Sequence, residues 1–181
     1  MDKLINSLTD KLKETFQDRL SSIIMYGSCA IDGCNDASSD INLIVLIDKL
    51  NASDLQKAHP LLKNWTKTQS PLPLFMDKQE WFNSTDVYSI EYSDIKERYK
   101  ILYGEDFVQA LVIDKNNLRF QCEHEVKNLL IRLRQTYLAK SSDKKAIENL
   151  IKTSSKTFIA IFRAILRLLD ENVPQKHGDV V

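Results

Sequence analysis

Residues 41–47, INLIVLI, form a short and almost continuously apolar run. A run of this length without alternating polar positions is typical of a strand that is covered on both faces. Four other segments are rich in β-branched and aromatic residues and are predicted to be strands, namely 22–26 (SIIMY), 71–77 (PLPLFMD), 87–95 (VYSIEYSDI) and 100–104 (KILYG). The buried run therefore favours a sheet with helices packed against it.

The segments around these strands have a helical period. Apolar residues recur every four positions at the start of the chain, at Leu4, Leu8, Leu12, Phe16 and Leu20. This spacing predicts an amphipathic first helix. A second helix is predicted in 52–67, with a break or kink at Pro60. We therefore expect residues 1–115 to form one α/β (α+β) domain, a mixed sheet flanked by helices.

The period changes after residue 116. Two long apolar stripes at helical spacing predict a helical C-terminal segment, with Ser-Ser-Asp at 141–143 as the cap of the second helix. Two helices alone cannot bury two wide stripes, so they need the first domain, a second copy of the chain, or helices beyond residue 181. We therefore expect 116–181 to be a helical domain or part of one, and a fragment of a longer protein is one interpretation.

Charge is unevenly distributed along the 181 residues. The chain has 25 basic and 25 acidic side chains, but residues 1–115 carry 13 Lys/Arg against 18 Asp/Glu, and residues 116–181 carry 12 against 7. A globally basic nucleic-acid binder is therefore not indicated, and disorder is disfavoured by the 43% hydrophobic content.

The composition also bears on location. There is no apolar run of the roughly 18 residues that a membrane span needs, and the first residues lack the apolar stretch of a signal peptide. Three cysteines cannot all pair with one another. We interpret them as reduced thiols of a cytoplasmic protein that has no membrane partner.

The segment 23–47 carries the chemistry. A predicted strand ends at Gly27-Ser28, an irregular stretch follows, and Asp40 begins the next strand. Glycine allows a ligand to approach the backbone closely, and a helix that begins at Ser28 would present free N–H groups to phosphate. Asp40 and Asn42 are two positions apart on a strand, so their side chains should point to the same face.

This pattern resembles the nucleotidyltransferase superfamily that includes DNA polymerase beta. In appearance it is nearest to the aminoglycoside adenylyltransferase-like and minimal nucleotidyltransferase proteins. The resemblance implies that Gly27 and Ser28 bind the triphosphate and that Asp40 and the residue at position 42 hold Mg²⁺. It also implies a third acid on a later strand, for which Glu91 fits best and Asp94 is a second candidate.

The same resemblance implies an activity. An enzyme of this kind transfers a nucleoside monophosphate from an NTP, with ATP favoured, to an acceptor hydroxyl and releases pyrophosphate, with Mg²⁺ as cofactor. Glu91 would be a metal ligand or the base that activates the acceptor. The sequence leaves the acceptor open among a small molecule, a protein and an RNA end.

One residue departs from the family pattern, because position 42 is Asn and not an acid. An amide offers a cation one neutral oxygen and no charge, so we expect weakened metal binding and slow or absent transfer. The alternative is therefore a catalytically inactive module that binds nucleotide or a protein, for example one half of a toxin–antitoxin pair, with a second copy or a helical protein as partner. Ordinary structural roles for Asp40, as a turn residue, and for Glu91, as an exposed strand residue, also stay open.

Overall fold

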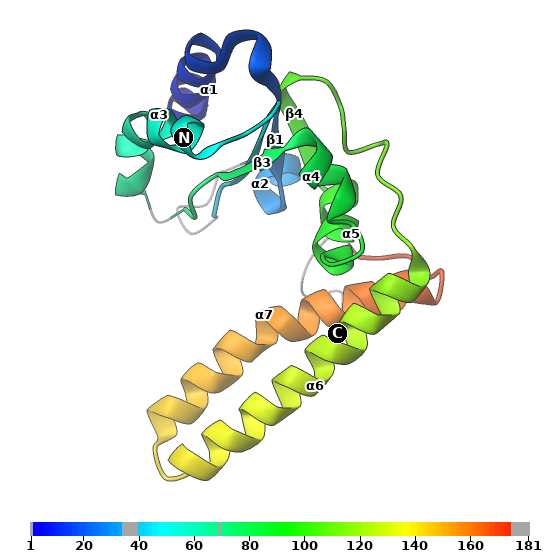
Figure 1. Cartoon of the computed structure of the whole chain (residues 1–181). Helices are drawn as coiled ribbons and strands as arrows, with labels where there is room; N and C mark the ends of the chain where they lie inside the picture. Colours follow the sequence, from blue (N-terminus) through cyan, green and yellow to red (C-terminus); the bar gives the residue numbers. More distant parts are fainter. Residues whose placement is uncertain (1, 34–39, 69, 175–181) are drawn as a thin grey trace. The chain divides into compact units, whose positions relative to one another are not determined.

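The computed structural model of the chain describes residues 2–33, 40–68 and 70–174 (Figure 1). The chain divides into two compact units. Unit 1 consists of Met1–Thr85 and Asp94–Val112, and unit 2 consists of Asp86–Ser93 and Ile113–Val181. Each unit is described separately below.

Unit 1 is built on one four-stranded sheet. Its strands are β1 (Leu20–Tyr26), β2 (Asn42–Ile47), β3 (Leu74–Asp77) and β4 (Tyr99–Gly104), in the order β3-β2-β1-β4. β1 pairs antiparallel with β2 and with β4, whereas β2 and β3 are parallel. Leu43 to Ile47 of β2 are all buried, so the predicted covered strand is confirmed. The mixed sheet with flanking helices confirms the predicted α/β class.

One face of the sheet is covered by α1 (Asp2–Phe16) and α3 (Ala52–Ala58). α1 contributes Ile5, Leu8, Leu12 and Phe16, which pack with alternate residues of β1 and β2. The predicted helix is therefore correct except at Leu20, which begins β1. The helix ends because Gln17 adopts a positive φ of 48°, a conformation that a continuing right-handed helix does not allow.

Short elements connect these parts of unit 1. They are η1 (Gln17–Arg19), α2 (Ser28–Asp32), η2 (His59–Lys63), η3 (Trp65–Lys67) and α4 (Lys78–Asn83). α3 gives way to a 3-10 helix with Pro60 in its first turn, which confirms the predicted break. Trp81 of α4 is fully buried and its indole N–H donates to the carbonyl of Phe107 at 3.3 Å.

The predicted strand at 87–95 is wrong, because the segment forms α5 (Ser89–Glu97). Its buried residues are Ser89, Ile90, Tyr92, Ser93 and Ile95, which recur at a helical spacing. The hydroxyl of Ser93 donates to the carbonyl of Ser89 at 2.7 Å, one helical turn back. A short run of β-branched and aromatic residues does not by itself distinguish a strand from a buried helix, and here helical packing prevails.

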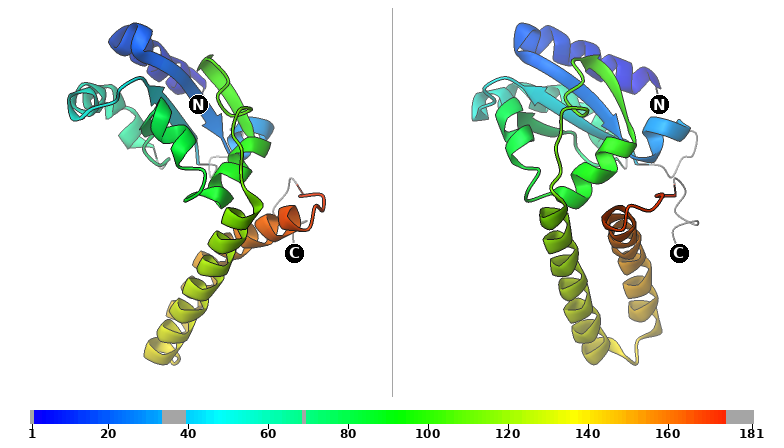
Figure 2. Two further views of the ribbon diagram at one scale, coloured as in Figure 1. Left: turned by 45° about the vertical axis from the view of Figure 1, so that its right-hand side comes forward. Right: turned by 90° about the vertical axis from the view of Figure 1, so that its right-hand side faces the viewer.

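Unit 2 is dominated by a hairpin of two long helices, α6 (Lys115–Lys140) and α7 (Lys144–Leu168), which lie side by side (Figure 2). Asp114 and Asp143 cap their first turns, so the predicted cap in 141–143 is confirmed at Asp143. A small core joins the hairpin to the start of α5 through Ile90, Leu118, Cys122 and Ala164. Among the described residues, no helix is long and apolar enough to cross a membrane.

The cysteines differ from expectation at one position. Cys29 is buried in α2 and is disulfide-bonded, which corrects the prediction that all three cysteines are reduced. Spacing in the sequence does not show whether two sulfur atoms come within bonding distance, since that depends on the fold. Cys122 is a free, buried thiol, and burial raises its pKa.

Candidate functional site

The turn after β1 is the centre of the candidate site. Gly27 has φ 84° and ψ −157°, a backbone conformation that glycine adopts easily and other residues rarely do. Its N–H donates to the carbonyl of Arg98 at 2.9 Å, and its own carbonyl accepts from the N–H of Ala30 at 3.1 Å. The turn is thus fixed on both sides and leads directly into α2, where Ser28 is exposed.

Asn42 lies beside this turn. In the antiparallel pairing of β1 with β2, Tyr26 is opposite Asn42, which places the next residue, Gly27, at the same end of the two strands. A Cβ atom added to Gly27 would lie 3.3 Å from Nδ2 of Asn42. The amide of Asn42 therefore occupies the space beside the α-carbon of Gly27, and the structure brings these two predicted residues together.

Asp40 is placed by the residue between it and Asn42. Ile41 is fully buried among the core residues of α1 and β2, and its N–H donates to the hydroxyl of Ser70 at 3.1 Å. Asp40 is exposed and Asn42 is partly exposed. This alternation is typical of extended chain and places the two polar side chains on the face away from Ile41, as predicted.

Glu91 is placed differently from the prediction. It lies on helix α5, in the part that belongs to unit 2, whereas Gly27, Asp40 and Asn42 belong to unit 1. Its exposed carboxylate accepts a hydrogen bond from Nε2 of Gln121 at 2.8 Å, and the N–H of Ile90 donates to Oε1 of the same glutamine at 2.7 Å. Glu91 thus has a structural partner in its own unit.

Asp94, the second candidate for the third acid, is three residues before the end of α5 and belongs to unit 1. It therefore shares a compact unit with Gly27, Asp40 and Asn42. Neither acid lies on a strand, because the whole 89–97 segment is helical.

The acids are not arranged as a complete metal centre. Within residues 2–33, 40–68 and 70–174, no three side chains of His, Cys, Asp or Glu gather in a way that could hold a metal ion. The turn offers one carboxylate from Asp40, one amide oxygen from Asn42 and one hydroxyl from Ser28. Mg²⁺ is usually bound by one or two carboxylates together with substrate phosphates, so this donor set fits the ion only when a nucleotide supplies the remaining oxygens.

Two residues near the turn were not singled out from the sequence. Arg98, which accepts the N–H of Gly27 through its carbonyl, is a buried arginine with 7% of its surface exposed. Tyr99 is opposite Tyr26 in the β1–β4 pairing and donates to Asp106 at 2.8 Å; desolvation, with that hydrogen bond, raises the pKa of Tyr99. An arginine and a tyrosine in a charged segment do not by themselves indicate a site from the sequence.

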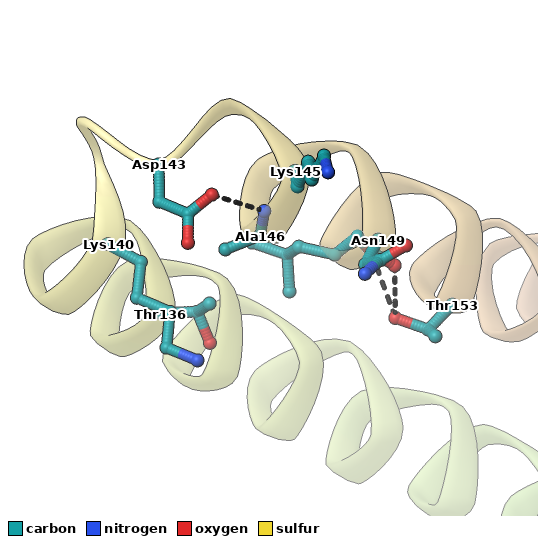
Figure 3. A pocket seen from close by; sticks show the side chains of 8 residues that line it. Thr136, Lys140, Asp143, Lys145, Ala146, Asn149 and Thr153 are labelled. Atoms are coloured by element: carbon teal, nitrogen blue, oxygen red, sulfur yellow. Dashed lines mark hydrogen bonds between the residues drawn. The ribbon is translucent and has the colours of Figure 1, made fainter.

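Two hollows lie in unit 2 and include none of the four predicted residues of unit 1. One, of about 300 Å³, is lined by Ile90, Glu91, Glu125, Thr157, Ala160 and Ile161. The other, of about 360 Å³, lies between α6 and α7 near the loop that joins them, and its polar lining includes Thr136, Lys140, Asp143, Lys145 and Asn149 (Figure 3).

Comparison with known proteins gives two likenesses, and no protein-family model matches the chain. The chain is 30% identical over 108 residues to an alanine–tRNA ligase of Malacoplasma penetrans. That match covers 58% of this chain but only 11% of the ligase, so the chain spans about a ninth of the length of this relative.

The second likeness is structural. Spectinomycin adenyltransferase AAD(9) from Enterococcus faecialis, solved with ATP and spectinomycin, aligns with a TM-score of 0.46 and 16% sequence identity, covering 99% of this chain and 94% of the other. The neighbour is an adenyltransferase, and a likeness this distant carries no argument about this chain.

Proposed function

We propose that the chain is a nucleotidyltransferase-like protein that binds a nucleoside triphosphate, with ATP favoured, at the turn after β1. The observation that carries this proposal is the contact between Gly27 and Asn42, beside the exposed side chains of Ser28 and Asp40. This contact supports the proposal because Gly27 and Asn42, to which the family pattern would assign phosphate and metal, lie together at one end of two adjacent strands.

In the proposed reaction the acceptor hydroxyl attacks the α-phosphorus of the NTP. A new P–O bond forms to the acceptor, the bond to the bridging oxygen of the β-phosphate breaks, and pyrophosphate leaves with the electron pair. Gly27 would let the backbone approach the triphosphate, and N–H groups at the start of α2 would face it. A base takes the acceptor's proton, a role that we assign to Glu91 or Asp94.

Mg²⁺, when bound with the nucleotide, would neutralise charge on the phosphates. Asp40 supplies the only negative charge among the three donors at the turn, and Asn42 supplies an uncharged oxygen. We therefore expect weak capture of the metal and slow transfer. The alternative is a module that binds nucleotide or a protein partner without turnover, and the missing negative charge at Asn42 favours this alternative.

An RNA end is a specific candidate for the acceptor. The chain resembles a segment of an alanine–tRNA ligase, and the exposed Lys140 and Lys145 line the hollow of Figure 3 together with one acid, Asp143. Lysine side chains attract phosphate backbones. We therefore include tRNA beside small hydroxyl compounds in the assays.

The test measures binding before chemistry. ATP with Mg²⁺ should raise the melting temperature of the natural protein, since a ligand that binds only the folded state stabilises it. Pyrophosphate release is then measured with tRNA or small acceptors. Ser28→Ala is the site variant and Ser21→Ala, on the same strand-turn segment, is the matched control. Ser28→Ala should reduce the nucleotide-dependent shift and Ser21→Ala should keep it. A natural protein whose melting temperature no nucleotide changes contradicts the proposal.

A further inference from the structure

The helical hairpin of unit 2 carries an apolar stripe along α6 that the described residues of the unit, up to 174, leave largely exposed. Val126, Leu130, Leu133 and Tyr137 follow one another at steps of four, three and four residues, so they lie on one side of the helix. Val126 is 45% exposed, Leu130 is 44% exposed and Tyr137 is 61% exposed. Side chains of this size are unusual in such numbers on one exposed side of a helix.

A second stripe runs along α7. Its members are Ile147, Ile151, Phe158, Phe162 and Ile165. Ile151 is 61% exposed, and the exposed rings of Phe158 and Phe162 stack on each other with centroids 6.2 Å apart. The two stripes are together called the hairpin's apolar face below.

The two stripes lie on the same side of the hairpin. Leu130 follows the buried Leu129 by one position, just as Phe162 follows the buried Ile161 and Ile165 follows the buried Ala164. In both helices, the side chain one position after a buried residue points away from the buried side by the same angle, rotated in the same sense when viewed from the N-terminus. Because α6 and α7 are antiparallel and their buried sides face each other, these equal rotations bring both stripes to the same side of the hairpin. The basic and polar residues of Figure 3 line the hollow between the same helices.

The side of the hairpin that carries the apolar face is large enough for a protein interface. Helices of 26 and 25 residues are about 37 to 39 Å long, and two helix widths at the usual 8–10 Å spacing give this whole side roughly 700 Å². A standard interface buries about 800 Å² on each partner, with an apolar centre and a polar rim. The nine residues of the apolar face include no charged side chain.

We propose that this face binds the same face of a second copy, so that two hairpins form a four-helix bundle with two-fold symmetry. A face made of two antiparallel helices is self-complementary, because a two-fold axis brings each stripe against an antiparallel stripe of the other copy. Residues of α7 also follow the alternating four-three spacing that bundle helices use, at Ile147, Ile151, Ser154, Phe158, Ile161, Ile165 and Leu168. Within this series Ser154 and Ile161 are already buried, whereas Ile151 and Phe158 are exposed on the apolar face. The inference is independent of the proposed nucleotide site.

The test is the mass of the full chain in solution, measured by light scattering and by sedimentation over a range of concentrations. Ile151→Lys places a charge on the apolar face, and Asn149→Lys places the same charge on the polar side of α7, where Asn149 lines the hollow of Figure 3. We expect a dimer of the 20.9-kDa chain for the natural protein and for Asn149→Lys, and at least a tenfold weaker dimer for Ile151→Lys.

Circular dichroism shows whether each variant is folded, and Ile151→Ser replaces Ile151→Lys if the lysine prevents folding. The melting temperature of the natural protein should also rise with protein concentration, as expected when folding is coupled to dimerisation. A natural protein that is monomeric at tens of micromolar overturns the inference. So does a dimer that Ile151→Lys or Ile151→Ser leaves unchanged, or binding of this face to another protein without self-association.

Discussion

The side-chain amide of Asn42 lies against the α-carbon of Gly27, so that a Cβ at position 27 would come within 3.3 Å of Nδ2. The residue that departs from the family pattern is thus in contact with the turn that the pattern assigns to phosphate. A substitution at one of these positions is therefore expected to alter the packing at the other. This contact also explains why the turn needs glycine for space as well as for its positive φ of 84°.

Gly27→Ala should lower stability and weaken nucleotide binding together. A side chain at this φ and ψ costs about 1–3 kcal/mol, and the new methyl group presses on Asn42. Denaturant unfolding and an ATP-dependent thermal shift measure the two effects. Gly27→Ala combined with Asn42→Ala removes the contact but not the backbone strain, so we expect only partial recovery. Full stability in Gly27→Ala alone would contradict the geometry of the turn.

Acid should destabilise unit 1 through Asp54. This carboxylate is buried, with 1% of its surface exposed, and accepts two hydrogen bonds from Arg19 at 2.6 and 2.9 Å. The hydrogen bonding from Arg19 lowers the pKa of Asp54 below its ordinary value. A lowered pKa means that the pair stabilises the fold fully above the unfolded pKa of about 3.9, and that this contribution is lost as the pH falls through the folded pKa.

The measurement is the free energy of unfolding between pH 7 and pH 3 for the natural protein and for Asp54→Asn. The variant should be less stable at pH 7, and its stability should fall less steeply toward acid. Asp48→Asn is the control, because Arg19 binds the backbone carbonyl of Asp48 and not its side chain. Parallel pH curves for the natural protein and Asp54→Asn would exclude the pair as the source of the acid sensitivity.

Gln121→Ala should destabilise unit 2 by about 1 kcal/mol, since it leaves the N–H of Ile90 and the carboxylate of Glu91 without their shared partner. Glu91→Gln keeps an acceptor oxygen for Gln121 and should leave stability unchanged within about 0.5 kcal/mol. Thermal unfolding measures both effects. The same Glu91→Gln protein then tests the third acid, because lost transfer with unchanged stability assigns that role to Glu91, and unchanged transfer moves it to Asp94.

Ser154→Ala should stabilise α7. The hydroxyl of Ser154 is buried, with 1% of the residue exposed, and within the described part of the chain it has no hydrogen-bond partner. Removing an unsatisfied hydroxyl favours the folded state by roughly 1 kcal/mol. Ser155→Ala is the matched control, because its exposed hydroxyl donates to the carbonyl of Ile151 at 2.8 Å and the change in helix propensity is the same. An equal effect of the two changes would contradict burial as the cause.

The elements that sequence reasoning predicted well are those with strong periodicity. The apolar run in β2 and the long stripes in α6 and α7 gave the correct type of element because each pattern continues for several turns or for a whole strand. The segment around Glu91 failed because it is short and rich in β-branched and aromatic residues, which both a strand and a buried helix accept.

Prediction of the candidate site from the sequence also succeeded only where the pattern was local. Gly27, Ser28, Asp40 and Asn42 are close in sequence to two predicted strands, so pairing those strands was enough to expect them together. The hydrogen bond from the N–H of Gly27 to the carbonyl of Arg98 joins residues far apart in the chain, and no local pattern encodes it. Such a long-range contact requires the three-dimensional structure.

The central claim is that Asn42 limits Mg²⁺–nucleotide binding at the turn, and calorimetric titration of ATP tests it directly in the natural protein and in Asn42→Asp. We predict that the natural protein binds ATP and gains little from Mg²⁺. In Asn42→Asp, Mg²⁺ should strengthen ATP binding at least tenfold, about 1.4 kcal/mol, because a second carboxylate joins Asp40. Asn6→Asp, on the exposed side of α1, should behave as the natural protein does. Binding of ATP that Mg²⁺ affects equally in all three proteins, or no binding in any of them, would contradict the account.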